Sequence, residues 1–214
     1  MELKGDLALV QNQPKDAATF YKEALTKQET NFLVVRLAAS QLRGGDRGAG
    51  LATLYGWLKR YPDDVYTRGA LADALLAAGQ MREAKEEFAK IVKLVPNNVA
   101  VLNNLAWASL QMGAVDEALS YAQRAYKLAP LQPQVLDTYA MSLLRKGSVA
   151  EAVDKLSKAA ERAPDDIGIS LHFAQALNAA GQSGKARQVL KDVLAKKLSL
   201  PQKKQAQGFL DTLK

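Results

Sequence analysis

Few residues of this chain have both the type and the spacing that catalysis or metal binding requires. His172 is the only histidine and there is no cysteine, so a zinc-type site would lack its usual nitrogen and sulfur ligands. Two pairs of adjacent carboxylates, Asp63-Asp64 and Asp165-Asp166, are of the kind that acid–base catalysis uses. Both pairs directly precede a predicted helix, where an aspartate side chain accepts hydrogen bonds from free backbone N–H groups. We therefore interpret them as helix caps and expect no metal site.

The segment Gly44-Gly45-Asp46-Arg47-Gly48-Ala49-Gly50 has enough glycine to approach a phosphate group closely. It lacks the lysine followed by serine or threonine that completes a phosphate-binding loop, so we interpret it as a loop between two helices. The sequence shows no arrangement of serine, histidine and acid that is typical of a nucleophilic hydrolase. We therefore predict a protein that is not an enzyme and that uses no cofactor and no small-molecule substrate.

Three kinds of residue recur along the chain with one period of 34 residues. They are the prolines Pro62, Pro96, Pro130 and Pro164, the glycines Gly45, Gly79, Gly113, Gly147 and Gly181, and the alanines Ala84, Ala118, Ala152 and Ala186. A fixed period of this length is the signature of a solenoid, in which each repeat packs on its neighbours. Such an architecture favours an extended binding surface over a catalytic pocket.

Each repeat predicts two amphipathic helices. In residues 65–98, for example, Leu71, Leu75 and Leu76 recur at helical spacing, and a second apolar stripe follows Gly79. The glycine supplies a turn because it adopts positive φ without penalty. The proline that follows the second stripe cannot continue a helix. The pattern predicts 13 helices along the chain and no strand.

This organisation resembles the tetratricopeptide repeat family, whose unit is a helix–turn–helix of 34 residues. The family prefers certain residues at positions 4, 7, 8, 20, 27 and 32, which are numbered here with residue 31 as position 1. Two consecutive units match, with Leu102, Leu105, Ala106, Ala118, Ala125 and Pro130, then Leu136, Ala140, Ala152, Ala159 and Pro164. Departures are Ala122, in place of an aromatic residue, and Leu198, in place of the last proline. The resemblance implies an all-α, right-handed α-solenoid of about six repeats, the first incomplete, with a C-terminal capping helix.

The period places complete repeats in one continuous solenoid domain, at residues 31–64, 65–98, 99–132, 133–166 and 167–200. Residues 1–30 hold a partial repeat, in which Ala17, Tyr21 and Ala24 occupy positions 20, 24 and 27. Because its first helix begins without a cap, we expect the chain to have been cut from a longer protein with further repeats upstream. Residues 201–214 form the predicted capping helix, which closes the last apolar face.

A narrower resemblance rests on residues 102–107, 118–130 and 135–138. These runs look like the C-terminal repeats of the PEP-CTERM system repeat lipoproteins, which accompany exosortase and exopolysaccharide gene clusters in Gram-negative bacteria. The resemblance implies an envelope protein that is periplasmic or held at the membrane by an anchor outside this sequence. Without that resemblance a cytoplasmic location fits equally well. No run of the sequence approaches the roughly 18 apolar residues of a membrane span.

In the tetratricopeptide family the first helices of the repeats line a concave groove, mainly through positions 2, 5, 6, 9 and 13. By resemblance, the groove of this chain is lined by Phe32, Val35, Arg36, Tyr66, Asp73, Asn103, Asn104, Trp107, Gln134, Asp137, Met141, Arg145, His172 and Gln175. The amides could pair with the backbone of an extended peptide, and Tyr66 and Trp107 could anchor its side chains. An alternative interpretation places Trp107 and Met141 in the core between repeats.

Some repeats of the family grip a C-terminal carboxylate with lysine at position 5 and asparagine at position 9. No unit of this chain has that pair, so we expect a different mode of binding. We predict a scaffold that binds a segment of a partner protein in the groove. Association of two copies through a terminal repeat is compatible with this function.

A rival hypothesis is binding of nucleic acid or another anionic surface. The net charge is +7, and residues 167–214 carry eight lysine or arginine residues against two aspartates. A basic end of this kind favours anionic partners. Base-reading repeats, however, need matched residues in every unit, whereas positions 2 and 5 change here from apolar to acidic to amide.

Overall fold

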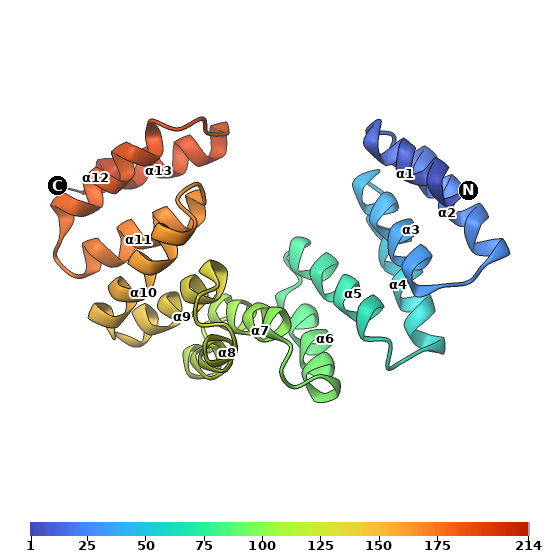
Figure 1. Ribbon diagram of the computed structural model, residues 1–214, viewed down its shortest axis with the longest axis horizontal. Coiled ribbons are helices and arrows are strands. Elements are labelled where there is room, and N and C mark those ends of the chain that lie inside the picture. The colour runs from blue at the N-terminus through green and yellow to red at the C-terminus, as the bar shows by residue number, and fades with distance from the viewer. Residues whose placement is uncertain (214) are drawn as a thin grey trace. The chain divides into compact units, whose positions relative to one another are not determined.

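The computed structural model describes residues 1–213, which form 13 α-helices and contain no strand (Figure 1). The predicted all-α solenoid class and the predicted number of helices are therefore confirmed over these residues. The helices form two compact units, Met1–Pro96 and the part of the chain from Asn97 onward. The first unit contains α1 (Glu2–Val10), α2 (Pro14–Lys27), α3 (Asn31–Arg43), α4 (Arg47–Arg60), α5 (Val65–Ala77) and α6 (Met81–Leu94). The second contains α7 (Val99–Gln111), α8 (Val115–Leu128), α9 (Pro133–Lys146), α10 (Val149–Arg162), α11 (Ile167–Ala179), α12 (Ser183–Leu194) and α13 (Leu200–Thr212).

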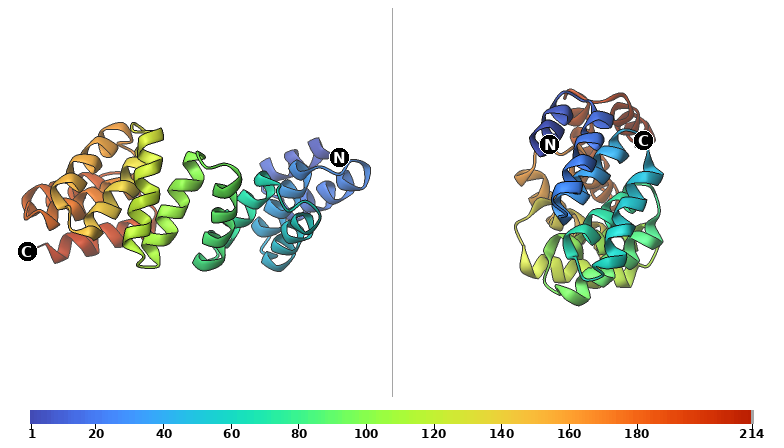
Figure 2. Two further views of the ribbon diagram at one scale, coloured as in Figure 1. Left: turned by 90° about the horizontal axis from the view of Figure 1, so that it is seen from below. Right: turned by 90° about the vertical axis from the view of Figure 1, so that its right-hand side faces the viewer.

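Consecutive helices pack as hairpins within each unit (Figure 2). The turn inside five of the hairpins has a glycine with φ between 74° and 91°, namely Gly45, Gly79, Gly113, Gly147 and Gly181. The predicted glycine turns are thus confirmed, because an L side chain rarely adopts this conformation. In the first hairpin Asn12 takes the corresponding place with φ of 57°. Asparagine is one of the few other residues that tolerate the left-handed region.

The polar residues that precede several first helices act as caps. The side chains of Asp64, Asn98 and Asp166 each accept a hydrogen bond from the backbone N–H three residues further on, at 3.1–3.3 Å. The interpretation of the two aspartate pairs as caps is confirmed for the second member of each pair. These hydrogen bonds satisfy N–H groups that have no partner within the helix.

Asp64 also joins three helices of the first unit. Its carboxylate accepts hydrogen bonds from Trp57 Nε1 of α4 at 2.6 Å, from Thr67 Oγ1 of α5 at 2.9 Å and from Asn31 Nδ2 of α3 at 3.2 Å. Burial by itself would raise the pKa of this carboxyl, but the hydrogen bonds from Trp57, Thr67 and Asn31 together lower the pKa below its ordinary value. The charged form of Asp64 therefore stabilises the junction of α3, α4 and α5.

The predicted loop over residues 44–50 is wrong in its second half, because α4 begins at Arg47. Asp46 caps this helix by accepting a hydrogen bond from the backbone N–H of Ala49 at 2.9 Å, which offsets the poor helix propensity of the glycines. Gly50 lies where α4 approaches α3, and a Cβ atom there would lie 2.7 Å from Leu42 Cγ and 3.2 Å from the Ala38 carbonyl oxygen. The absence of a side chain at Gly50 therefore allows the two helices to approach this closely.

In the other repeats alanine takes the place of Gly50. These alanines are fully buried (0% exposed) in both units, and they are Ala17, Ala84, Ala118, Ala152 and Ala186. The second unit ends with α13, which covers α12 through the buried side chains of Ala206 and Leu213. Arg187 of α12 holds the end of α13 by donating to the Leu213 carbonyl from Nε at 3.0 Å and from a terminal nitrogen at 2.6 Å.

We predict that Gly50→Ala destabilises the protein by about 1–3 kcal/mol, because the added methyl group overpacks the contact with Leu42. Gly56, on the same helix, is a matched control because a Cβ atom there has no neighbour within 4 Å. Gly56→Ala should be neutral or stabilising by up to about 1 kcal/mol, as expected from helix propensity alone. Urea unfolding followed by circular dichroism measures both. Equal effects of the two substitutions would contradict the close approach of α3 and α4.

We also predict that Asp64→Ala lowers stability at neutral pH by about 1–2 kcal/mol through loss of the cap and of the bond to Trp57. The pKa of Asp64 is lowered in the folded state, so its contribution is present above the unfolded pKa and is lost as the pH falls through the folded pKa. The difference from wild type should therefore shrink in acid. Asp63→Ala, at the exposed neighbouring residue, is the control. A difference that does not depend on pH, or an equal loss in the control, would refute this role.

Candidate functional site

The first helices of successive repeats pack side by side in the second unit, where α9 contacts both α7 and α11. We call the surface formed by α7, α9 and α11 the first-helix face. Six of the predicted groove residues are at least partly accessible on these helices: Asn103, Asn104, Trp107, Asp137, His172 and Gln175. Gln134 is exposed near the start of α9 and Arg145 near its end. The remaining predicted residue of this unit, Met141, is buried.

Asp137 and His172 form a hydrogen-bonded pair that joins α9 to α11. The His172 Nδ1 atom lies 2.8 Å from Asp137 Oδ1 and 3.0 Å from Oδ2. The two side chains are only 14% and 23% exposed for Asp137 and His172, respectively. Because a carboxylate can only accept hydrogen bonds, Nδ1 must carry the proton.

Trp107 of α7 reaches the same place. Its ring centroid lies 5.9 Å from that of His172, with the planes tilted by 41°. The indole also packs against the core cluster that contains Met141 and Tyr139. Trp107 therefore packs against the core and also lies beside His172 on the first-helix face.

Asn103 lies one helical turn before Trp107, on the same side of α7. Its Oδ1 atom is buried and has no hydrogen-bond partner. A buried acceptor without a partner costs about 1–3 kcal/mol, so such atoms are uncommon in native proteins and call for an explanation. Because this oxygen is closed off from solvent, a donor on a bound molecule reaches it only if the Asn103 side chain rotates toward the surface.

Met141 does not contribute to an accessible surface. It is 6% exposed and belongs to the core cluster with Tyr139 and Leu143. Its side chain is therefore a packing element of the second unit, in agreement with the alternative interpretation. Arg145 lies apart from the Asp137–His172 pair. It lines a surface hollow of about 580 Å³ with Lys146 and the turn at residues 113–117.

The first unit has a second cluster, on α1 and α3. The guanidinium of Arg36 lies 4.9 Å from the centre of the Phe32 ring and forms an ion pair with Asp6 at 3.0 Å. Tyr21 of α2 donates a hydrogen bond to the same aspartate. Burial and then this hydrogen bond raise the pKa of the Tyr21 hydroxyl to about 12. The positive charge of Arg36 is thus already paired with the carboxylate of Asp6.

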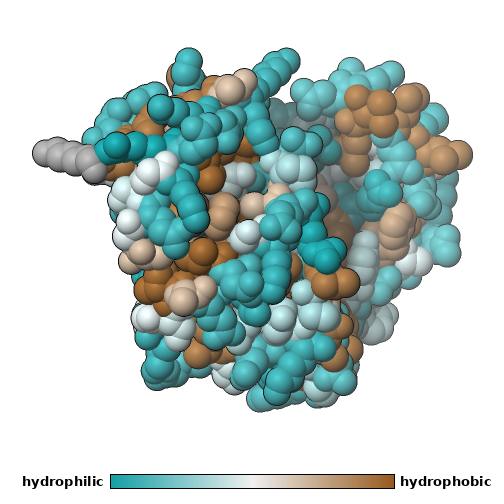
Figure 3. Space-filling view, turned by 60° about the vertical axis from the view of Figure 1, so that its left-hand side comes forward, coloured by the Kyte–Doolittle hydropathy of each residue, from teal (hydrophilic) through white to brown (hydrophobic). Residues whose placement is uncertain are grey.

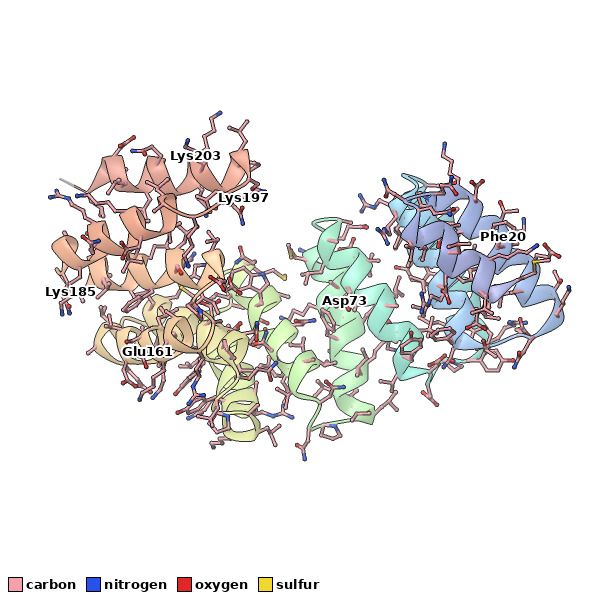
Figure 4. All side chains as sticks on the ribbon, turned by 45° about the horizontal axis from the view of Figure 1, so that its top comes forward. Phe20, Asp73, Glu161, Lys185, Lys197 and Lys203 are labelled. Carbon is pink, nitrogen blue, oxygen red and sulfur yellow. The ribbon has the colours of Figure 1, made fainter. Side chains whose placement is uncertain are left out.

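Asp6 was not among the predicted groove residues, although a signal for it exists. The partial repeat places Ala17 at position 20, which puts Asp6 at position 9, one of the groove positions. The other predicted residues of this unit are Val35, which is partly buried, and Tyr66 and Asp73, which are exposed. Figure 4 labels Asp73 on α5.

The basic residues near the C-terminus do not gather at one place. Lys185 lies close to the start of α12, whereas Lys197 follows the end of this helix and Lys203 lies on α13 (Figure 4). Lys196 donates to the Pro164 carbonyl, and Arg187 is used to hold α13. On the face visible in Figure 3, hydrophilic and hydrophobic residues are mixed, and no single continuous apolar area is seen.

Within residues 1–213, no group of three or more His, Cys, Asp or Glu side chains is placed to hold a metal ion. Over the same residues, none of the helices has the length and apolar character needed to cross a membrane.

Two stretches of the chain, residues 70–133 and residues 143–213, match models of the tetratricopeptide repeat. These residues are therefore tetratricopeptide repeats, and the fold is that of a protein–protein interaction scaffold. A comparison with curated proteins finds no match to the sequence.

Solved structures of tetratricopeptide repeat proteins have the same fold. One from Parabacteroides merdae has a TM-score of 0.82 at 14% identity and covers 97% of this chain and 83% of its own. TTC0263 from Thermus thermophilus has a TM-score of 0.62 at 21% identity and covers 81% of this chain and 95% of its own. YrrB has a TM-score of 0.64 at 16% identity and covers 88% of this chain and 97% of its own. At these identities the likeness establishes the fold alone.

We predict that Met141→Ala destabilises the protein by about 2–5 kcal/mol, because it removes a buried side chain and leaves a cavity. Gln134→Ala, at an exposed position on the same helix, should change stability by less than about 0.5 kcal/mol. Thermal and urea unfolding of the two variants measure the difference. A Met141→Ala variant as stable as wild type would show that this side chain faces solvent.

Proposed function

We propose that this protein binds an extended segment of a partner protein along the first helices of its repeats. The observation that carries the proposal is the cluster of Asn103, Trp107, Asp137 and His172 on the first-helix face. These four side chains come from α7, α9 and α11, and they combine an aromatic surface with hydrogen-bonding groups that a peptide can use. Small numbers of aromatic anchors with polar neighbours are typical of peptide-recognition surfaces.

A structural neighbour supports this proposal. YrrB, which has a similar fold, is a tetratricopeptide repeat protein with an unusual peptide-binding site. Tetratricopeptide scaffolds are generally non-enzymatic, and we propose the same for this chain. A place in the exosortase and exopolysaccharide system stays a prediction from the sequence resemblance.

Binding of an anionic surface through the basic end is the second candidate, and the net charge of +7 favours it. The positions of the basic residues argue against it. They are spread over both ends of α12 and over α13, and two of them hydrogen-bond to backbone carbonyls of the same unit. Phosphate recognition needs several cations that converge on one path, so the first-helix face is the better candidate.

We predict that Asn103→Ala combined with Asp137→Ala weakens binding of a peptide partner more than Lys203→Ala combined with Lys204→Ala. The first pair removes polar groups of the first-helix face, whereas the second removes two exposed charges from α13. Peptides selected on the wild-type protein from a phage-displayed random library serve as ligands. Affinity is titrated at two salt concentrations, and circular dichroism confirms that both double variants are folded.

Binding that owes little to counterion release should weaken only modestly when salt is raised. The opposite result, in which the lysine pair dominates and affinity collapses with salt, would place the site on the basic end. Failure of the library to yield any peptide sensitive to the first double variant would reject the proposed groove.

A further inference from the structure

The cluster on the first-helix face offers acceptors of hydrogen bonds where a bound segment would meet it. Asn103 Oδ1 is a buried acceptor without a partner, and Asp137 is an acceptor-only carboxylate. His172 lies beside this carboxylate and donates a hydrogen bond to it from Nδ1. The π face of Trp107 adds a surface with partial negative charge.

The three first helices carry few charged residues, and these are unevenly placed. Neither α7 nor α11 contains a charged residue, apart from the titratable His172. On α9, Asp137 is the only acidic residue, and the two cations Arg145 and Lys146 occupy its last turn, beside the hollow at residues 113–117. The middle of the first-helix face therefore has a carboxylate without a lysine or arginine on these helices to pair with it.

We propose that Asn103, Trp107, Asp137 and His172 form a subsite for a cationic side chain of the bound segment, with arginine preferred over lysine. The planar guanidinium can stack on Trp107 while its N–H groups donate to the Asp137 carboxylate and, once the Asn103 side chain rotates toward the surface, to Asn103 Oδ1. A cation supplies both the charge that Asp137 attracts and the donor that Asn103 lacks. This inference rests on the proposed function, because it specifies which side chain the groove selects.

The positive net charge of the protein does not oppose this preference strongly. Exposed charges farther away than the Debye length, about 8 Å at physiological ionic strength, are largely screened. The seven basic residues from Lys185 to Lys204 lie on α12, on α13 and in the segment between them, and none of these seven lies on the first helices. Contacts inside a partly buried cluster are screened much less than these surface charges.

The test uses the full chain and small probes, so that it does not depend on a known partner. Because His172 is the only histidine, its imidazole signals in NMR report on this site alone. The protein is titrated with Nα-acetyl-arginine amide and with the citrulline analogue, which has nearly the same shape and no charge. The lysine analogue and Nα-acetyl-glutamate amide complete the series. The indole N–H signals are followed in parallel, with Trp57→Phe used to assign Trp107.

We expect the arginine probe to shift the His172 and Trp107 signals and to bind at least about tenfold more tightly than the citrulline probe, because charge-assisted hydrogen bonds are the stronger ones. Asp137→Asn should abolish this difference, whereas Asp192→Asn, at an exposed aspartate of α12, should preserve it. Trp107→Leu should weaken the arginine probe while retaining an apolar side chain against the core. Thermal unfolding identifies any variant that fails to fold, and Asn103→Ser then provides a milder change at the same cluster.

A lysine probe that binds as well as arginine would overturn the preference for arginine and leave a cationic subsite without that preference. Citrulline or glutamate probes that bind as tightly as arginine would overturn it, as would an arginine response that survives Asp137→Asn. These outcomes can be distinguished from failure of the proposed function by the peptides selected from the library. If selected peptides without basic residues bind in a manner sensitive to the Asn103 and Asp137 double variant, the groove stands and the cationic subsite falls.

Discussion

The contact between the two helices of each hairpin is the constraint on which the rest of the structure depends. At one position of every repeat the second helix has an alanine or a glycine where it packs against the first. The alanines there are fully buried, and at Gly50 even a methyl group would overlap Leu42. A larger side chain would push the helices apart, and the loss of dispersion contacts would extend along the whole hairpin.

This constraint also controls what each hairpin can present to its neighbours. The turn between the two helices of each hairpin has one residue with positive φ, and this fixed turn geometry sets how the second helix aligns along the first. Capping by Asp64, Asn98 and Asp166 then fixes where three of the first helices begin. In the second unit these features place α7, α9 and α11 side by side, so that groups separated by one repeat length can meet. The pair of Asp137 and His172 is 35 residues apart in sequence and in hydrogen-bonding contact in space.

The two clusters on first helices differ in how well their charges are compensated. In the first unit Arg36 is paired with Asp6 and stacked on Phe32. In the second unit Asn103 Oδ1 has no donor, and the Asp137 carboxylate accepts a hydrogen bond from His172 but has no lysine or arginine of these helices beside it. An uncompensated group that is partly removed from water is more costly to the folded chain than a paired one, and that cost is recovered when a ligand supplies the missing partner. For this reason we regard the second cluster as the stronger binding candidate.

The helices and their order could be predicted from the residue pattern. The period of 34 residues in glycine, alanine and proline identified the helices, the turns and the caps, because each depends on local backbone geometry and on the spacing of apolar residues. The exception was the glycine-rich segment at residues 44–50, where tertiary packing requires glycine inside a helix. The resemblance to the tetratricopeptide family, carried over position by position, assigned the groove candidates to one side of the first helices.

Which of these candidates are accessible, and which of them contact each other, depends on how the helices pack in the folded chain. This packing buried Met141, kept Trp107 at the edge of the core, paired Asp137 with His172 and left Asn103 Oδ1 without a partner. It also brought Asp6 to Arg36. None of this follows from spacing, because hydrogen bonding and burial depend on the distances between helices that are far apart in sequence. Those distances are set by side-chain packing, which a repeating pattern of residue types does not specify.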